Sequence, residues 1–281
     1  MTKIWAHTLV KNESRWLWYA VSSIIEHVDR LLLWDTGSTD NSIEIEKALI
    51  KKYPEKIEFK QRKIFGTADF TNARQEMLDA TNSDWFLMLD GDEIWWEDSI
   101  KKVVKAIDAV EAINNDGKNI ESIVVPTVNL VGDIFHYQEK SAGRYKFGDR
   151  TGHYNLRAIN RSISGLKSLG VHGLWGWADG ENKMIQDRNS YKFIDAPYLH
   201  ATNLKRSVLD NDVIKRKKKH RFEIGEEFPK DFYYPEVLFR GRSYLIESPW
   251  QIMENNFKFR AFFETPARKL KRKVFKGGVG Y

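Results

Sequence analysis

Three carboxylate side chains stand within four positions in the stretch WFLMLDGDE, where Asp90, Asp92 and Glu93 follow the apolar residues 85–89. The apolar run is short and does not alternate with polar residues, which is typical of a strand buried on both faces in a parallel sheet. Ligands of open α/β sheets bind just beyond the carboxyl ends of such strands. Because neighbouring carboxylates repel one another, we expect a divalent cation here, with Gly91 letting the chain turn tightly. The alternative is a solvated acidic turn that binds nothing.

Two further polar segments follow predicted strands. VKNES comes after a strand at residues 3–10, and WDTGSTD includes the end of a strand at residues 30–34. Apolar residues at helical spacing follow both strands, and more strands are predicted at 56–62 and 122–130. This alternation predicts an α/β fold with a parallel sheet, helices on both faces and right-handed crossovers. The polar segments are therefore expected at one edge of the sheet.

The composition narrows the class of protein. The chain has 281 residues and a formal net charge of +6, and it has no cysteine, which excludes disulfides, a thiolate zinc site and a cysteine nucleophile. No apolar run is long enough to span a membrane, and no signal segment stands at the N-terminus, so we expect a cytoplasmic protein. The sequence signatures of dinucleotide-binding folds, P-loops, zinc proteases and serine hydrolase elbows are absent.

Four motifs in order carry a resemblance to a known family: V-K-N-E, D-T-G-S-T-D, FTNARQEML with its Arg74, and L-D-G-D-E. Residues 4–95, and more loosely the chain through His200, resemble the nucleotide-sugar half of family-2 glycosyltransferases. The resemblance implies a GT-A fold, a Rossmann-like and mostly parallel sheet flanked by helices, followed by a mixed acceptor half. It also implies a metal-dependent, inverting transfer of a sugar from a nucleotide diphosphate to an acceptor hydroxyl.

The resemblance implies that the first two strand ends bind the nucleoside of the donor. Asp35 would accept a hydrogen bond from a nucleobase N–H, usually of a pyrimidine, so UDP is the favoured nucleotide. Its alternative role is to cap the following turn. Thr8, Val10 and Asn12 would line the base and ribose pocket. Glu13 would either join that pocket or stabilise the start of the following helix with its charge.

The resemblance likewise implies that residues near 90 bind the diphosphate and the metal. Arg74 would pair with a phosphate or with Asp90, unless it is a solvated residue on a helix face. In the D-x-D element of Asp90, Gly91 and Asp92, the first carboxylate meets the ribose or a metal-bound water. The second carboxylate binds Mn²⁺ or Mg²⁺, and Glu93 supports the cluster from behind.

The resemblance also implies a further metal ligand, because GT-A enzymes often complete the site with a histidine that comes late in the chain, and His200 is the candidate. His200 ends the stretch FIDAPYLH, which is predicted to be a strand or an extended segment. A neutral imidazole suits manganese better than magnesium. The competing interpretation is a partly buried histidine that bonds to the backbone.

An inverting transfer also needs a base that takes the proton from the acceptor hydroxyl. Relatives carry R-L-F-R…H-E, whereas NLRAINRSISGLKSLGVHGLWGW has Gly173 where that pattern has glutamate. We predict Asp179 as the base, with Glu181 and His172 as alternatives. The competing interpretation is that all three are loop residues without a catalytic role.

The end of the chain is strongly basic. We predict a catalytic domain at 1–205, with a donor half at 1–118 and an acceptor half at 119–205, and a basic, helical extension at 206–281. The run KRKKKHR and a later helix with Ile252, Phe259 and Phe263 at near-helical spacing suggest peripheral contact with the inner face of an anionic membrane. Pro266 is expected to end that helix. Alternatively, the phenylalanines pack on the catalytic domain and the charges are solvated.

The resemblance points to polysaccharide biosynthesis and to a glycan or lipid-linked acceptor. A sugar-phosphate nucleotidyltransferase is the nearest alternative enzyme, but LVKNESRW lacks the glycine-rich loop that would hold a triphosphate. A non-enzymatic basic protein that binds a membrane or nucleic acid is the other alternative. It leaves the carboxylates at the strand ends unexplained, and we expect no nucleic-acid partner.

Overall fold

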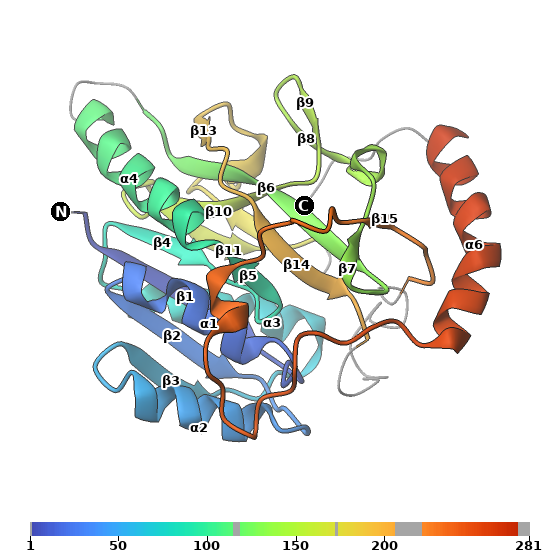
Figure 1. Cartoon of the computed structure of the whole chain (residues 1–281). Helices are drawn as coiled ribbons and strands as arrows, with labels where there is room; N and C mark the ends of the chain where they lie inside the picture. The colour runs from blue at the N-terminus through green and yellow to red at the C-terminus, as the bar shows by residue number, and fades with distance from the viewer. Residues whose placement is uncertain (1, 115–118, 172–173, 206–220, 275–281) are drawn as a thin grey trace.

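The computed structural model describes residues 2–114, 119–171, 174–205 and 221–274 and has an α/β architecture around one large central sheet (Figure 1). The strands of this sheet run in the order β15-β7-β6-β10-β4-β1-β2-β3, with β13, β14 and β5 joined beside β6. The predicted α/β class, with a partly parallel sheet flanked by helices, is confirmed.

The first half of the chain forms the parallel part of the sheet. Its strands β1, β2, β3 and β4 alternate with helices and pair in parallel. The elements, in order, are β1 (Ile4–Val10), α1 (Leu17–Ile24), β2 (Arg30–Asp35), α2 (Ser42–Lys52), β3 (Ile57–Gln61), α3 (Gly66–Ala80), β4 (Trp85–Met88), β5 (Glu93–Trp95) and α4 (Glu97–Asn114). The carboxyl ends of β1, β2 and β4 therefore lie at one edge, as the sequence predicts.

The second half of the chain mixes strand directions. Strand β10 (Tyr154–Asn160) is antiparallel to β4, and β6 (Ser122–Val131) is antiparallel to β10. The remaining elements are β7 (Asp133–Tyr137), β8 (Tyr145–Phe147), β9 (Arg150–Gly152), β11 (Lys167–Leu169), β12 (Gly176–Ala178), β13 (Tyr191–Phe193), β14 (Tyr198–Asn203), β15 (Glu226–Glu227) and α6 (Asn255–Val274), with short 3₁₀ turns at Ile25–His27, Lys140–Ala142, Ile185–Asp187 and Glu236–Phe239.

Both faces of the sheet are covered. Apolar side chains of α1, α2 and α4 pack on one face, where Leu17, Leu49 and Val103 belong to the largest core cluster. On the other face, Met77 of α3 packs against strand residues of β1 and β2, and Trp177 of β12 packs over β4 and β10. This double layer keeps the parallel strands buried and rigid, so the polar groups at their ends are held in fixed positions.

One expectation about local structure is wrong. Helix α6 does not end at Pro266 but continues to Val274. Proline removes one backbone donor, but α6 is continuous from Asn255 to Val274 with Pro266 inside it. The tight turn expected at Gly91 is confirmed, because the Glu93 amide donates to the Asp90 carbonyl at 3.1 Å, although Gly91 is not among the residues with positive φ. A Cβ added at this position would stand 3.1 Å from Glu13 Cγ, so a larger residue would need the Glu13 side chain to shift.

Candidate active site

Strand register brings His200 to the D-x-D segment. Strand β14 lies between β5 and β6, so that His200 pairs with Glu93 on one side and with Asn129 on the other. The Ala201 amide donates to the Asp92 carbonyl at 2.9 Å, which ties the two segments together. Residues more than a hundred positions apart in the sequence therefore share one site.

The side chains at this site form a possible metal-binding group. Asp90, Glu93 and His200 each offer one ligand atom, and these atoms all lie within 4.8 Å of one another. His200 Nε2 also lies 3.4 Å from Asp92 Oδ1. The Asp90 side chain is 36% exposed, whereas those of Asp92 and Glu93 are buried, so Asp90 forms the accessible side of the group. Carboxylate oxygens with one imidazole nitrogen are a donor set that fits Mn²⁺ or Mg²⁺.

Two arginines offset the negative charge. Arg157 comes from a β-bulge in β10, where the register shifts between Leu156 and Ala158, and bulges near active sites commonly re-aim a side chain. Its guanidinium contacts both Asp90, at 3.5 Å, and the fully buried Glu93. Arg74 of α3 reaches Asp90 at 3.6 Å and is buried, so it is not a solvated residue on a helix face.

The pKa values respond to this environment in different ways. Burial acts to raise the pKa of Asp90, but Arg157 and Arg74 outweigh it and keep the pKa below the usual range. For Glu93, burial dominates and raises the pKa to about 7 in spite of Arg157. For His200, burial acts to lower the pKa, but the adjacent Asp92 outweighs it and raises the value. The site therefore stabilises positive charge next to Asp92.

A chain of hydrogen bonds fixes the tautomer of His200. His153 Nε2 lies 3.1 Å from the Glu139 carbonyl, which only accepts, so Nε2 carries the proton and Nδ1 accepts from the Asn129 amide at 2.8 Å. Burial lowers the pKa of His153, which favours this neutral form. The Asn129 side-chain oxygen then lies 3.1 Å from His200 Nδ1 and accepts a hydrogen bond from its N–H. In neutral His200 this leaves the Nε2 lone pair facing Asp92, as in histidines that bind metals.

The loops after β1 and β2 are bound to each other at the same edge. Asn12 has φ of 56°, a conformation that asparagine tolerates, and its Oδ1 accepts from the Thr39 amide at 2.7 Å. The Glu13 amide donates to Ser42 Oγ at 2.8 Å. The Glu13 side chain packs against Gly91, which links these loops to the D-x-D turn.

Asp35 caps the turn that follows β2. Its Oδ1 accepts from the amides of Gly37, at 2.8 Å, and Ser38, at 3.0 Å, whereas its Oδ2 has only a longer contact of 3.3 Å with Ser38. The capping role is therefore present in the structure. A carboxylate has about four acceptor positions, so capping and nucleobase recognition are compatible.

The two remaining donor-pocket candidates are both buried. The Val10 carbonyl accepts from the amide of Thr36 at 2.8 Å and from its hydroxyl at 2.7 Å, so this carbonyl joins the loops. The Thr8 hydroxyl has no hydrogen-bond partner among the described residues. Both candidates lie on β1, which ends at the edge where Asn12 and Asp35 stand.

The predicted bases are not brought to this group by the described part of the chain. Asp179 Oδ1 accepts from the amides of Glu181 and Lys183, and its Oδ2 pairs with Arg188 at 2.7 Å. Arg188 also pairs with Glu121, which precedes β6 at the edge where β4 begins. The four residues of β4 separate the two edges by roughly 13 Å. Glu181 is exposed on the same turn, and His172 lies outside the described residues.

Comparison with known proteins identifies the family. The sequence model of the family described as glycosyl transferase family 2 matches residues 7–166, more than half of the chain. The chain belongs to glycosyl transferase family 2. The predicted enzyme class, a glycosyltransferase, is thereby confirmed, and the match includes the end of β1, all of β2 and β4, and the D-x-D segment.

Individual relatives share this class. The SPbeta prophage-derived glycosyltransferase SunS of Bacillus subtilis strain 168 is 25% identical over 108 residues, which are 38% of this chain and 24% of SunS. The aligned part thus spans about a quarter of that relative. Among solved structures, S. aureus TarS has a TM-score of 0.45 at 13% identity, covering 72% of this chain and 37% of TarS.

A second solved structure is the glucosyl-3-phosphoglycerate synthase of Mycobacterium tuberculosis in complex with Mn²⁺, UDP and glucosyl-3-phosphoglycerate. Its TM-score is 0.43 at 16% identity, covering 71% of this chain and 72% of that chain.

The sequence analysis assigned no role at the D-x-D group to two residues of this glycosyltransferase that shape the site. Arg157 is one of the arginines in NLRAINRS, but only the bulge in β10 shows that it points to Asp90 and Glu93. Asn129 lies within a predicted strand and had no signal, because its role depends on the register between β6 and β14. Pairs of residues that meet across non-sequential strands leave no local pattern in the sequence.

Proposed function

We propose that this glycosyltransferase moves a sugar, with inversion, from a nucleotide diphosphate donor to a hydroxyl of a glycan or lipid-linked acceptor. UDP is the favoured nucleotide. The observation that carries the proposal is the group of Asp90, Glu93 and His200 ligand atoms within 4.8 Å of one another, at the edge where β1, β2 and β4 end. Family membership supports the class of reaction, and the group supports its dependence on a divalent cation.

The metal would be held by Asp90, Asp92 and His200, with Glu93 adjacent. Bound Mn²⁺ or Mg²⁺ would neutralise the charge that develops on the leaving nucleoside diphosphate. The protein supports this with its own groups. Arg157 and Glu93 form a buried pair that fixes the backbone beside Asp90, and Asn129 orients the His200 imidazole. Arg74 lies close enough to Asp90 to contact a phosphate bound there.

The nucleoside would bind at the connected loops after β1 and β2. Asp35 is the proposed partner of the base, and Thr8, Val10, Asn12 and Glu13 are proposed to shape the pocket around it. The mutual hydrogen bonds of these loops support the proposal, because a pocket that is ordered before the donor arrives loses less conformational entropy on binding.

The acceptor hydroxyl needs a base. Asp179 is engaged by two backbone amides and by Arg188, so we assign it a structural role, together with its turn. Of the predicted bases this leaves His172, which lies outside the described residues. Replacing Asp179 and His172 separately and measuring turnover as a function of pH decides between them. The pKa of the catalytic base determines where turnover falls with pH, so the profile should change only when the base is replaced.

The first experiment is an assay of nucleoside diphosphate release from a panel of nucleotide sugars, with Mn²⁺, Mg²⁺ or a chelator, and with or without glycan acceptors. We expect release that needs the metal and is greatest with a UDP-sugar. Release that persists unchanged in the chelator would contradict the proposed metal dependence. The anomeric configuration of the product, followed by NMR, tests inversion.

The same assay addresses the alternative enzyme. A sugar-phosphate nucleotidyltransferase would exchange pyrophosphate into a nucleoside triphosphate, whereas a glycosyltransferase releases a nucleoside diphosphate. The family match favours the glycosyltransferase over both the nucleotidyltransferase and a non-enzymatic binding protein.

A further inference from the structure

Helix α6 has an apolar face that does not pack on the rest of the protein. Phe259, Phe262, Phe263, Leu270 and Val274 are between 63% and 71% exposed. At about 100° per residue, these positions fall within an arc of about 120° around the helix. The interpretation in which Phe259 and Phe263 pack on the catalytic domain is therefore wrong. Exposed apolar side chains gathered on one face commonly mark an interaction site.

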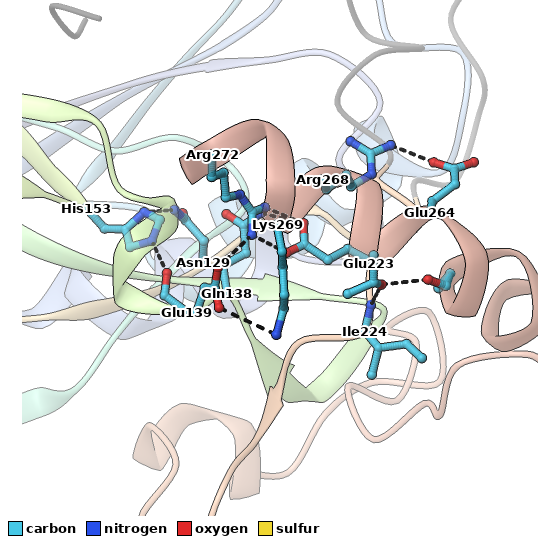
Figure 2. Close-up of polar contacts among 12 residues, drawn as sticks. Asn129, Gln138, Glu139, His153, Glu223, Ile224, Glu264, Arg268, Lys269 and Arg272 are labelled. Atoms are coloured by element: carbon cyan, nitrogen blue, oxygen red, sulfur yellow. Dashed lines mark hydrogen bonds and ion pairs between the residues drawn. The ribbon is translucent and has the colours of Figure 1, made fainter. Parts of the chain in front are cut away.

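The opposite face of α6 is attached to the acceptor half. Phe257 and Ala261 are buried in a small core, and the Ile224 amide donates to Thr265 Oγ1 at 2.8 Å. Arg272 forms two 2.6 Å contacts with the buried Glu223, as Figure 2 shows. Figure 1 shows the helix at one end of the molecule, beyond β7 and β15. The inner face is thus committed to the protein, and the apolar face is directed away from it.

Basic side chains border the apolar face on both sides. Lys258 and Lys269 fall along one border and Arg260 and Lys271 along the other, and all four are exposed. Over the whole helix, seven basic residues stand against one acidic residue, Glu264. An apolar stripe between two basic borders is the arrangement of helices that lie in the plane of an anionic bilayer.

The charge distribution around the apolar face of α6 favours one binding partner over another. Two copies of this chain that joined through the same face would bring like-charged borders together, which is unfavourable. An anionic bilayer offers negative headgroups to both borders and acyl chains to the phenylalanines between them. In the described part of the chain, no helix is long and apolar enough to cross a membrane, so contact of this kind would be interfacial.

We propose that α6 is an interfacial anchor, whose Phe259, Phe262, Phe263, Leu270 and Val274 enter the headgroup boundary of an anionic bilayer while the basic borders contact its headgroups. The run at 215–221, predicted to share this role, lies outside the described residues except for Arg221. The proposal does not depend on the proposed reaction, because vesicle binding is measured without donor or acceptor.

The test is flotation of the full chain with vesicles of phosphatidylcholine alone or mixed with phosphatidylglycerol. We expect binding only to the anionic vesicles, and weaker binding as salt rises. Replacing Phe259, Phe262 and Phe263 together by serine should reduce binding at least tenfold. The matched control replaces Phe65 and Tyr244, which are 78% and 96% exposed and lie outside α6, and should bind like the unaltered chain.

The contribution of the basic residues and the insertion of the apolar face into the bilayer are tested separately. Lys258→Gln and Lys271→Gln should each weaken binding about fivefold at low salt. Because the chain has no cysteine, Phe262→Cys gives one labelling site for an environment-sensitive fluorophore, whose emission should shift to the blue with anionic vesicles. A fluorophore at Tyr244→Cys should not shift.

Three outcomes would overturn the proposal. The first is no binding of the unaltered chain to anionic vesicles. The second is equal binding by the triple serine variant when circular dichroism shows that both are folded. The third is that the chain is a dimer in solution, does not bind vesicles, and becomes a monomer in the triple serine variant. That result would show that the apolar face contacts a second copy of the chain.

Discussion

Two acidic clusters lie at opposite ends of β4, and their negative charges are balanced in different ways. At the edge where β4 ends, Asp90, Asp92 and Glu93 meet Arg157, Arg74 and His200. At the edge where β4 begins, Asp179 and Glu121 share Arg188. Both clusters combine carboxylates with arginine, but only the first has the geometry of a metal site.

The difference lies in where the hydrogen bonds come from. Asp179 fills its acceptor positions with amides of its own turn, and Glu121 accepts from Asn119 and from the Ser190 hydroxyl as well as from Arg188. The D-x-D group is instead assembled from α3, β5, β10 and β14, and its most exposed member, Asp90, faces the accessible side. Carboxylates satisfied by local amides stabilise a turn, whereas carboxylates gathered from several elements create a position for a cation.

The largest effect should come from removing the arginine of the first cluster. Arg157→Met should lower the free energy of unfolding by about 3–5 kcal/mol, because it leaves the fully buried Glu93 without its partner. Urea denaturation measures the loss. Arg188→Met, the matched change in the second cluster, should cost less because its carboxylates keep other donors. Adding Glu93→Gln to Arg157→Met should recover much of the stability. Equal losses of stability in Arg157→Met and Arg188→Met would contradict the proposed difference between the two clusters.

Turnover should separate the two clusters next. Asp92→Asn should reduce metal-dependent turnover by about 10²–10³-fold, because it preserves shape but removes charge next to the cation. Asp179→Asn should keep turnover near that of the unaltered chain while lowering the melting temperature, because its carboxylate pairs with Arg188. Nucleoside diphosphate release and thermal unfolding measure both. The reverse result, an inactive Asp179→Asn beside an active Asp92→Asn, would move the chemistry to the other edge.

The predicted metal ligand supplied by β14 gives a smaller effect. His200→Gln should raise the Mn²⁺ concentration for half-maximal turnover by about tenfold, since one ligand is lost while the carboxylates remain. A titration of turnover against Mn²⁺ measures it. His136→Gln is the control, because His136 also pairs with an aspartate, Asp133, but outside the site. An unchanged Mn²⁺ requirement in His200→Gln would leave the histidine as a purely structural partner of Asn129.

A buried carboxyl outside both clusters sharpens the comparison, because no arginine among the described residues pairs with it. Glu46 of α2 is fully buried, and neither of its oxygens has a hydrogen-bond partner among the described residues. Burial, with smaller contributions from Asp35 and Asp40, raises its pKa from 4.5 to about 9. The folded protein then binds one proton more than the unfolded chain between these values. Its stability falls as pH rises through that window, with a slope of up to about 1.4 kcal/mol per pH unit.

Glu46→Gln should remove this slope. We would measure urea unfolding at several pH values between the two pKa values. The free energy of unfolding of the variant should rise relative to that of the unaltered chain as pH rises. Below the lower value, both chains carry a neutral side chain and should differ little. A constant difference across the window would mean that Glu46 is ionised in the folded protein.

Much of the first half of the chain could be predicted from the sequence, because its signals are local. The apolar run before Asp90, the helical spacing after β1 and the polar residues at the strand ends all reflect neighbouring positions. The family resemblance, and not a local signal, predicted His200 as a late arrival at the site, and β14 does bring it beside Asp92. Its role as a ligand stays a prediction.

The second half of the chain could not be predicted to the same extent. The aim of Arg157 depends on a bulge, and the position of Asp179 depends on which edge of the sheet its hairpin covers. The three-residue strand β5 is too short to have a pattern of its own. Helix α6 passes through Pro266 because its inner face is held by contacts from Phe257 to Arg272, and such tertiary contacts outweigh a local breaking signal.

The hydrogen-bonded chain from Glu139 through His153 and Asn129 to His200 links the site to α6. Glu139 also pairs with two basic residues of α6, Lys269 and Arg272 (Figure 2). Thermodynamic coupling between two binding sites is reciprocal. If a bilayer bound to α6 shifted Glu139 and thereby His200, it would change the affinity of the site for a cation, and the cation would change the affinity of α6 for the bilayer by the same factor.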